Sequence, residues 1–294
     1  MIAREGRITV TDGRSVAFTD YGTPEDIAVV WCHGGPGSRV ETEICAQGAT
    51  RAGLRLIGID RPGHGCSTSQ AGRSIGGWVS DALAVVDHLG IDRFVSVGAS
   101  TGGAYALALA SQSRRAIGAV ACCAVTDMRW AEGRAMMASA HPVWDAPTRE
   151  AAAAIVLEQF GGRGEKIAVH TTGEGITESD RALFVPPENL AIWLRNIEQM
   201  FAQGVGGYTD DRRADGGGWG SFDVSAITCP VIVLHGSSDT FVPVAQAHHT
   251  AALVPGASVQ IVDDFGHFSI LTEMPGTIAA VLARAAAGPV AVVQ

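Results

Sequence analysis

The stretch Phe94-Val95-Ser96-Val97-Gly98-Ala99-Ser100-Thr101-Gly102-Gly103 decides the fold. Its apolar beginning predicts a buried strand, and the Ala-rich run 104–110 that follows predicts a helix. Ser100 therefore stands at a tight strand-to-helix corner, which lifts its hydroxyl above the sheet and makes it a candidate nucleophile. Glycines two residues before and two after it let the two backbones approach closely. The alternative is an ordinary loop with a capping serine.

A nucleophilic serine needs a base, an acid that orients the base, and donors for the developing oxyanion. His267 is the candidate base, because a strand-like run at 258–263 leads into a Gly-His loop before a helical pattern. The other histidines lie in Gly-rich turns, on helical patterns, at a strand end or in a long segment without strands: His33, His64, His88, His141, His170, His235, His248 and His249.

Asp239 is the candidate orienting acid. It lies in the loop after the apolar strand pattern 230–235, where a carboxylate could hold the imidazole in the tautomer that accepts the serine proton. An aspartate there could instead cap the following helix. Asp127, which follows the strand pattern 116–125, is the rival for the same role.

The candidate oxyanion loop is His33-Gly34-Gly35-Pro36-Gly37, which ends the apolar strand pattern 27–32. Backbone N–H groups can approach a developing charge most closely where no side chain intervenes, which favours glycine. We expect one donor to be the N–H of Gly35. The other is the N–H of Thr101, directly after the candidate nucleophile.

The order Ser100, Asp239, His267, preceded by His-Gly-Gly-Pro-Gly, resembles the α/β-hydrolase fold superfamily. Segments 58–67 and 235–243 are similar to two further loops of that fold, so the resemblance spans roughly residues 5 to 285. It implies an enzyme with a serine nucleophile, a small-molecule substrate, and no required cofactor or metal.

Composition is compatible with this resemblance. A chain of 294 residues with 47% hydrophobic and 17% charged residues can form one large α/β domain. The net charge of −9 disfavours nucleic acid as a partner. No signal-peptide core and no run approaching a membrane span is evident, which predicts a cytoplasmic protein without a membrane partner. The six cysteines lack Cys-x-x-Cys spacing and are predicted to be reduced core thiols. The oligomeric state stays open.

Strand and helix patterns alternate over most of the chain. Residues 7–21 predict an edge hairpin turning at Asp12-Gly13. Further strands are expected near 54–59 and 93–98 besides those above, with helices near 40–52, 74–89, 102–113, 243–254 and 270–286. This alternation predicts the α/β class, with a mostly parallel central sheet flanked by helices. The predicted core comprises residues 1–127 and 226–287, with a flexible tail at 288–294.

Residues 128–225 interrupt the alternation and predict a helical cap inserted after the sixth strand, with helical patterns at 147–160 and 187–203. Between 130 and 225 there are 8 basic and 14 acidic residues, a net charge of −6. This charge indicates either a solvated acidic surface or a site that prefers an amine-bearing substrate. Tryptophans here could fill the core of the cap or, with Gly34, line an apolar substrate pocket: Trp130, Trp144, Trp193 and Trp219.

We therefore expect a capped serine hydrolase that cleaves a small to medium carboxylic ester through an acyl-enzyme. An aminopeptidase resembling proline iminopeptidases is an alternative suggested by His-Gly-Gly-Pro-Gly and the acidic cap. Those enzymes usually have a tryptophan where Thr101 stands. A carbon-carbon bond hydrolase with the same triad and a non-enzymatic small-molecule receptor on the same scaffold are further alternatives.

Overall fold

The computed structural model describes residues 3–167 and 176–287, so the predicted tail at 288–294 and His170 lie outside the described residues. Its centre is an 8-stranded sheet in the order β1-β2-β4-β3-β5-β6-β7-β8. The β1–β2 hairpin is antiparallel, β2 runs antiparallel to β4, and all other neighbours are parallel. This confirms the predicted fold class. The strands are β1 (Ala3–Thr9), β2 (Ser15–Tyr21), β3 (Ile27–Cys32), β4 (Leu54–Ile59), β5 (Phe94–Ala99), β6 (Ala116–Cys122), β7 (Val231–Gly236) and β8 (Ser258–Val262).

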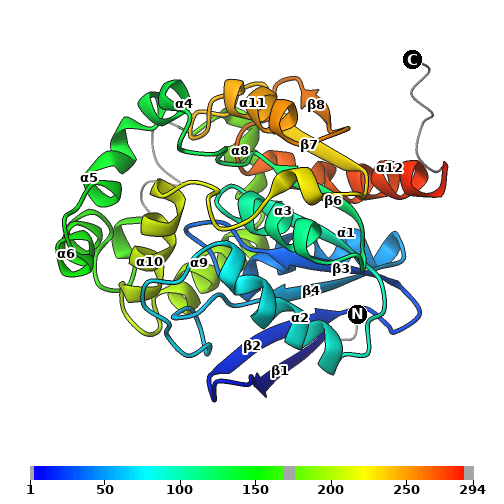
Figure 1. Ribbon diagram of the computed structural model, residues 1–294, viewed down its shortest axis with the longest axis horizontal. Helices are drawn as coiled ribbons and strands as arrows, with labels where there is room; N and C mark the ends of the chain where they lie inside the picture. Colours follow the sequence, from blue (N-terminus) through cyan, green and yellow to red (C-terminus); the bar gives the residue numbers. More distant parts are fainter. Residues whose placement is uncertain (1–2, 168–175, 288–294) are drawn as a thin grey trace.

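Helices cover both faces of the sheet (Figure 1). Side chains of α2 and α3 form one apolar layer with the sheet, and those of α1 and α12 form the other. The sequence of strand β3 is apolar throughout because both faces of the strand are buried. Val30 and Cys32 lie in the first layer, whereas Val29 and Trp31 lie in the second. The helices of the core are α1 (Glu43–Arg51), α2 (Val79–His88), α3 (Gly102–Gln112), α11 (Ala245–Leu253) and α12 (Met274–Ala287), with 3₁₀ turns at Arg39–Thr42, Gly76–Trp78, Val224–Ala226 and Ser269–Glu273.

Residues 128–225, hereafter the inserted segment, lie between β6 and β7 and form a helical layer beyond one end of the sheet (Figure 1). The segment has an apolar cluster of its own, which includes Val156, Trp193 and Met200 and reaches Phe268 of the core. The helices of this segment whose bounds the structure describes are α4 (Ala131–Met136), α5 (His141–Trp144), α6 (Arg149–Phe160), α8 (Glu178–Leu183), α9 (Pro187–Met200) and α10 (Gly206–Gly216), with a 3₁₀ turn at Ala138–Ala140.

Helix α12 corrects one sequence expectation. With the turn before it, Ser269–Ala287 has 19 residues and a mean hydropathy of 1.2, so within the described chain it is long and apolar enough to cross a membrane by those criteria alone. In the structure α12 packs on β6, β7 and α1, with Ile278 and Val281 buried against the sheet. One face of α12 therefore belongs to the core, and 33% of the apolar window is buried.

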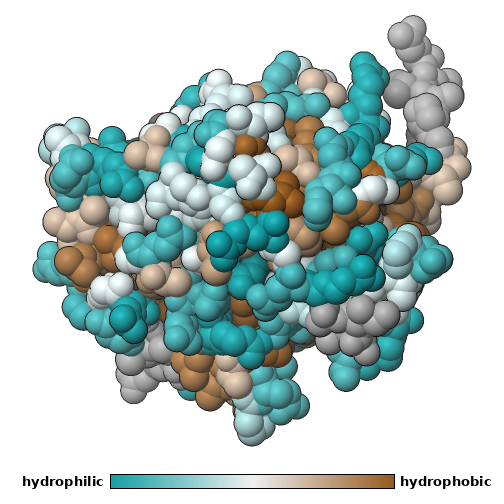
Figure 2. Space-filling model, turned by 90° about the horizontal axis from the view of Figure 1, so that it is seen from below, coloured by the Kyte–Doolittle hydropathy of each residue, from teal (hydrophilic) through white to brown (hydrophobic). Residues whose placement is uncertain are grey.

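Large apolar side chains on the surface are dispersed over different elements: Ile27, Met136, Leu157, Val185, Leu194, Phe241 and Leu253. Figure 2 shows one face of the molecule, on which hydrophilic side chains surround several smaller apolar patches. The cysteines are free thiols, but Cys66 is exposed and Cys229 only half-buried. The expectation that all six lie in the core is therefore wrong for these two, because Cys66 lies in the loop after β4 and Cys229 in the loop before β7.

Candidate active site

Ser100 occupies the corner between β5 and α3, and its φ is +53°. A Cβ at position 98 would lie 2.0 Å from the carbonyl oxygen of Gly102, and a Cβ at position 102 would lie 2.0 Å from the carbonyl oxygen of Cys32. Only glycine fits at either position. The positive φ of a non-glycine residue is held in place by this close packing, as expected for a functional corner.

His267 and Asp239 are joined by a 2.7 Å hydrogen bond between Nδ1 and Oδ2. Asp239 is fixed from its other side, because the backbone N–H groups of Phe241 and Val242 donate to its Oδ1 at 2.8 and 2.9 Å. The His235 ring lies 3.3 Å from Oδ2. The predicted acid thus holds the predicted base from the loop after β7.

These contacts also set the pKa values of the pair. Burial alone would raise the pKa of Asp239, but the nearby charge of His267 and the hydrogen bonds outweigh it and lower that pKa below its usual range. Burial alone would lower the pKa of His267, yet the Asp239 carboxylate raises it well above the ordinary value. The carboxylate therefore stabilises the imidazolium that would form when His267 takes a proton.

Asp127, the rival acid, is engaged elsewhere. Its carboxylate pairs with the Arg129 guanidinium at 2.6 Å and accepts the backbone N–H of Trp219 at 3.1 Å. Chain direction explains the difference, since the residues after β6 turn away into the inserted segment. The predicted strand 116–125 also ends earlier, at Cys122, because Cys123 has a φ of +40°.

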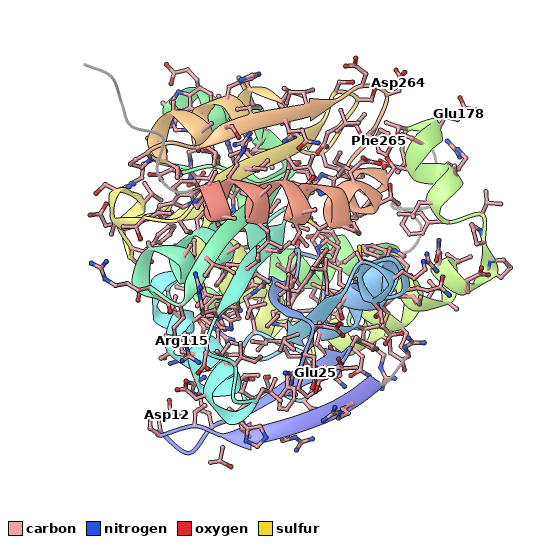
Figure 3. All side chains as sticks on the ribbon, turned by 90° about the vertical axis from the view of Figure 1, so that its right-hand side faces the viewer. Asp12, Glu25, Arg115, Glu178, Asp264 and Phe265 are labelled. Atoms are coloured by element: carbon pink, nitrogen blue, oxygen red, sulfur yellow. The ribbon has the colours of Figure 1, made fainter. Side chains whose placement is uncertain are left out.

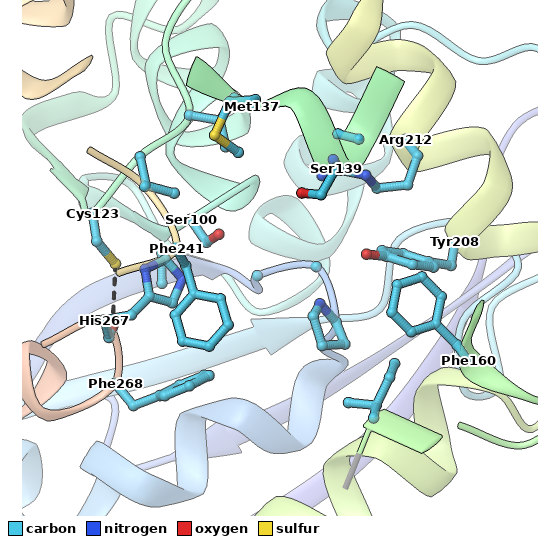
Figure 4. Close-up of a pocket in the computed structure, with 18 of the residues that line it drawn as sticks. Ser100, Cys123, Met137, Ser139, Phe160, Tyr208, Arg212, Phe241, His267 and Phe268 are labelled. Atoms are coloured by element: carbon cyan, nitrogen blue, oxygen red, sulfur yellow. Dashed lines mark hydrogen bonds between the residues drawn. The ribbon is translucent and has the colours of Figure 1, made fainter. Parts of the chain in front are cut away.

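Ser100 and His267 open into the same cavity of about 680 Å³ (Figure 4). The Ser100 hydroxyl makes no hydrogen bond to any residue that the structure describes, His267 included. In proteins without substrate, bonds of this kind are often long and tighten when substrate binds. The cavity is therefore the place where a reacting group would meet both side chains.

The Gly34–Gly35 peptide has a defined direction. Its carbonyl oxygen accepts a hydrogen bond from Arg61 Nη2 at 2.9 Å and lies 2.8 Å from His33 Nδ1. In a trans peptide the N–H points opposite to the carbonyl. The N–H of Gly35 is thus turned away from Arg61, and within the described chain neither it nor the N–H of Thr101 has an acceptor. Both predicted oxyanion donors are available.

Arg61 is itself held by the inserted segment. Asp211 of α10 accepts from Arg61 Nε and Nη2 and from Arg73, and all three side chains are buried. Burial alone would raise the pKa of Asp211, but the two guanidinium groups lower it far below its usual range. Sequence reasoning did not find this link, because helix α10 ends in a Gly-rich run that predicts a loop.

A second carboxylate of the inserted segment holds the loop of His267. Asp180 of α8 accepts the backbone N–H groups of His267, Phe268 and Ser269 at 3.0, 2.9 and 2.7 Å. Figure 3 shows α8, marked by Glu178, beside the loop that follows β8. The inserted segment therefore positions both the candidate base and the candidate oxyanion loop.

Glu41 and Cys123 line the cavity but were not predicted. Glu41 accepts the Trp31 Nε1–H at 2.8 Å and the Gly34 N–H at 2.9 Å, and burial raises its pKa to about 7. Cys123 donates to the backbone carbonyl oxygen of His267 at 3.4 Å (Figure 4). The sequence did contain a signal for Cys123, because it directly follows β6, the strand next to β5. Parallel strands end at the same edge of the sheet, so Cys123 could be expected near Ser100.

Cys123, Asp239 and His267 could also hold a metal by spacing alone, because their ligand atoms lie within 4.8 Å of one another. The Nδ1 and Oδ2 atoms are already joined by the 2.7 Å hydrogen bond. Burial raises the pKa of the Cys123 thiol well above its ordinary value, which disfavours the thiolate that a metal requires. The donor set therefore fits hydrogen bonding better than metal binding.

Of the residues predicted for the substrate pocket, Gly34 and Trp193 line the cavity, whereas the other three tryptophans do not. Trp130 stacks on His249 with ring centroids 4.1 Å apart. Trp144 packs under the Arg134 and Arg212 guanidinium groups, and Trp219 belongs to the apolar layer of α2 and α3. The expectation is wrong for these three because their ring faces pack within the protein. Phe160, Phe241 and Phe268 provide aromatic lining instead.

The chain belongs to the alpha/beta hydrolase fold family, whose model matches residues 27–274. A non-heme haloperoxidase of Rhodococcus erythropolis is 25% identical over 274 residues, which cover 88% of this chain and 92% of the relative. A carboxylesterase structure from the thaumarchaeon Nitrososphaera gargenis matches with a TM-score of 0.73 at 17% identity, over 97% of this chain and 100% of its own. An epoxide hydrolase structure from hot-environment metagenomes matches with a TM-score of 0.71 at 19% identity, over 98% of this chain and 100% of its own.

These relatives have different activities on one fold. The structural likenesses show the fold alone, and the site must decide the chemistry. An enzyme of the hydrolase superfamily acting on a small molecule is supported, whereas the bond that it cleaves is a separate question.

Proposed function

We propose that this protein is a serine hydrolase that cleaves a carboxylic ester of small to medium size. The observation that carries the proposal is the convergence of Ser100 and the His267–Asp239 pair on one cavity, beside two backbone N–H groups that have no acceptor among the described residues. A nucleophile, a base, an acid that orients the base and an oxyanion site are the parts that acyl transfer requires.

In the first half-reaction Ser100 Oγ attacks the ester carbonyl while His267 accepts the hydroxyl proton. The negative charge that develops on the carbonyl oxygen is stabilised by the N–H groups of Gly35 and Thr101. Collapse of the tetrahedral intermediate breaks the bond to the alcohol oxygen, which takes the proton from His267. Water then repeats the sequence on the acyl-enzyme, releasing the acid and regenerating the Ser100 hydroxyl.

The lining favours an organic acyl or alcohol group. Val143, Phe160 and Trp193 of the inserted segment face the cavity together with Phe241 and Phe268 of the core. We infer that the inserted segment acts as a cap that excludes water and selects the substrate. A cavity of about 680 Å³ accommodates a small or medium ester.

An aminopeptidase has less support. To bind a free α-amino group, the cap would need carboxylates turned to the cavity. In the described chain Asp210, Asp211 and Asp215 are instead paired with arginines, and Asp180 accepts backbone N–H groups. Glu41 does line the cavity, but it accepts hydrogen bonds from Trp31 and Gly34.

The test is a screen of nitrophenyl esters graded by acyl length, run beside aminoacyl anilides, with Ser100→Ala as the blank. We expect ester turnover that falls about 10⁴-fold or more in Ser100→Ala, because members of a catalytic triad act as a unit. A fluorophosphonate probe should label Ser100 and leave the other serines unmodified. Turnover retained in Ser100→Ala, or faster release of N-terminal residues than of esters, would overturn the proposal.

A further inference from the structure

One wall of the cavity carries polar side chains that the ester chemistry does not use. Ser139, Tyr208 and Arg212 all line the cavity. Figure 4 shows them on the side away from His267, Phe241 and Phe268, with the two hydroxyl groups directed inward. The cavity thus has an aromatic side next to the candidate base and a polar corner, formed by Ser139, Tyr208 and Arg212, facing it.

Arg212 is held in a fixed orientation. Its Nη1 donates to Asp215 Oδ2 at 3.1 Å, and its guanidinium lies 5.3 Å from the centre of the Trp144 ring. Asp215 also accepts the Thr101 hydroxyl at 3.0 Å. Although Arg212 is only 9% exposed, its other N–H groups donate to no residue that the structure describes. Most of the fork is therefore free to bind a ligand in the cavity.

Tyr208 likewise has a hydroxyl group that is available to a ligand. It is 4% exposed, and its hydroxyl makes no hydrogen bond within the described chain. Edge contacts with Phe160 and Phe201 hold the ring. A Cβ at Gly35 would lie 3.3 Å from Tyr208 Cε2, so this ring contacts the loop that offers the oxyanion donor. The polar corner therefore begins next to the carbonyl that would react.

The polar corner contains one cationic side chain, Arg212, which is paired with Asp215 through a single Nη1 contact. Arg212 is the one arginine or lysine among the cavity-lining residues that the structure describes. The Glu41 carboxylate, which also lines the cavity, already accepts hydrogen bonds from Trp31 and Gly34. The free donors of Arg212 and Tyr208 line the cavity, so a ligand that supplies acceptor oxygens and negative charge can form charge-assisted hydrogen bonds here.

We propose that Arg212, with the hydroxyls of Tyr208 and Ser139, binds a carboxylate of the substrate, so that the ester or lactone cleaved is an anion. A guanidinium fork matches two carboxylate oxygens, and the neighbouring hydroxyls can donate to the same group. This inference rests on the proposed function, because it places the charged group relative to the carbonyl that Ser100 attacks. It is the opposite of the alternative in which the acidic inserted segment selects an amine-bearing substrate.

The first experiment compares nitrophenyl half-esters of succinic, glutaric and adipic acid with their neutral methyl diesters. A second pair, acetyl esters of hydroxy acids and of their methyl esters, puts the carboxylate on the alcohol side. We expect kcat/KM about tenfold to a hundredfold higher for the carboxylate member of at least one pair, which is the range for a charge-assisted hydrogen bond. Equal rates for both members of every pair would overturn the inference.

The variants are Arg212→Gln, Arg212→Lys and Tyr208→Phe, with Arg213→Gln as the matched control. Arg213 is the next residue on α10, but it donates to the carbonyl oxygens of Ala146 and Thr148 and does not line the cavity. Arg212→Gln should abolish the preference for the carboxylate, measured as the ratio of kcat/KM between the charged and the neutral member of each pair. Arg212→Lys should retain part of it, Tyr208→Phe should reduce it severalfold, and Arg213→Gln should leave it unchanged. Loss of the preference in Arg213→Gln as well would contradict the assignment.

Binding separates this inference from the proposed function. Monomethyl glutarate is titrated calorimetrically into Ser100→Ala protein with and without Arg212→Gln. Binding that weakens about tenfold in the double variant supports the carboxylate site even if no ester is turned over, in which case the proposed function alone fails. Ester turnover without any Arg212-dependent binding or preference leaves the proposed function standing and refutes the carboxylate site.

Discussion

Replacing Asp211 by asparagine tests whether the inserted segment holds the oxyanion loop in place. The carboxylate faces the side chains of Arg61 and Arg73, which are 0% and 1% exposed. Removing one partner of a buried ion pair leaves an uncompensated charge and costs about 3–5 kcal/mol. Since about 1 kcal/mol shifts the melting temperature of a large domain by about 2–4 °C, we expect Tm to fall by about 10 °C.

Asp210→Asn provides the matched control, because it removes the same charge from the preceding residue of α10. Its partner Arg149 has a side chain that is 36% exposed and can be hydrated when the carboxylate is lost. The expected cost is about 1 kcal/mol or less. Thermal and urea unfolding followed by circular dichroism measure both variants.

Activity gives a second readout for Asp211→Asn. Arg61 donates to the carbonyl oxygens of His33 and Gly34, so a displaced Arg61 releases the peptide that directs the Gly35 N–H. Loss of one oxyanion donor costs about 10²- to 10³-fold in kcat with little change in KM. Equal destabilisation by the two variants, or an Asp211→Asn protein with normal Tm and kcat, would refute this reasoning.

The stability difference should also depend on pH. The pKa of Asp211 is far lower in the folded protein than in the unfolded chain, so its contribution is complete above the unfolded value of about 3.9 and is lost as the pH falls below it. Unfolding free energies of the wild type and Asp211→Asn should therefore converge in acid. A gap that stays constant down to about pH 3 would contradict the assigned pKa shift.

Three further predictions concern the candidate residues and the substrate. Asp239→Asn should lower kcat by about 10⁴-fold by favouring the wrong tautomer of His267, while Asp127→Asn should stay within about tenfold; steady-state kinetics showing the reverse ranking would move the acid to the loop after β6. Asp239 raises the pKa of His267, and His267 must be neutral to act as the base. Ester turnover should therefore rise with pH, with an apparent pKa above about 6.5. A pH–rate profile that is flat between about pH 5 and 8 would exclude His267 as the base. Each added acyl methylene should raise kcat/KM up to about fourfold until the cavity is full, whereas an acyl series without any trend would show that the inserted segment does not select on size.

The sequence determined the central fold and placed the candidate residues, because these depend on local rules. An apolar run followed by Gly-Ala-Ser-Thr-Gly can form a strand, a corner and a helix whatever lies elsewhere, and the parallel sheet brings the ends of its strands to one edge. The loops of Ser100, Gly35, Asp239 and His267 could therefore be named from the residues. The choice between Asp239 and Asp127 could not, since it depends on which loop turns toward His267.

Only the tertiary structure decided what surrounds these residues. Arg212 and Tyr208 reach the cavity because α10, a helix that its own glycines and aspartates do not favour, is held by buried ion pairs with residues more than a hundred positions away. Trp130, Trp144 and Trp219 do not line the cavity for a similar reason. Each ring packs on residues that are distant in the sequence, and no local sequence pattern predicts these contacts. Helix angles and long-range ion pairs depend on contacts between distant segments, so the shape and charge of the cavity appear only when the chain is folded.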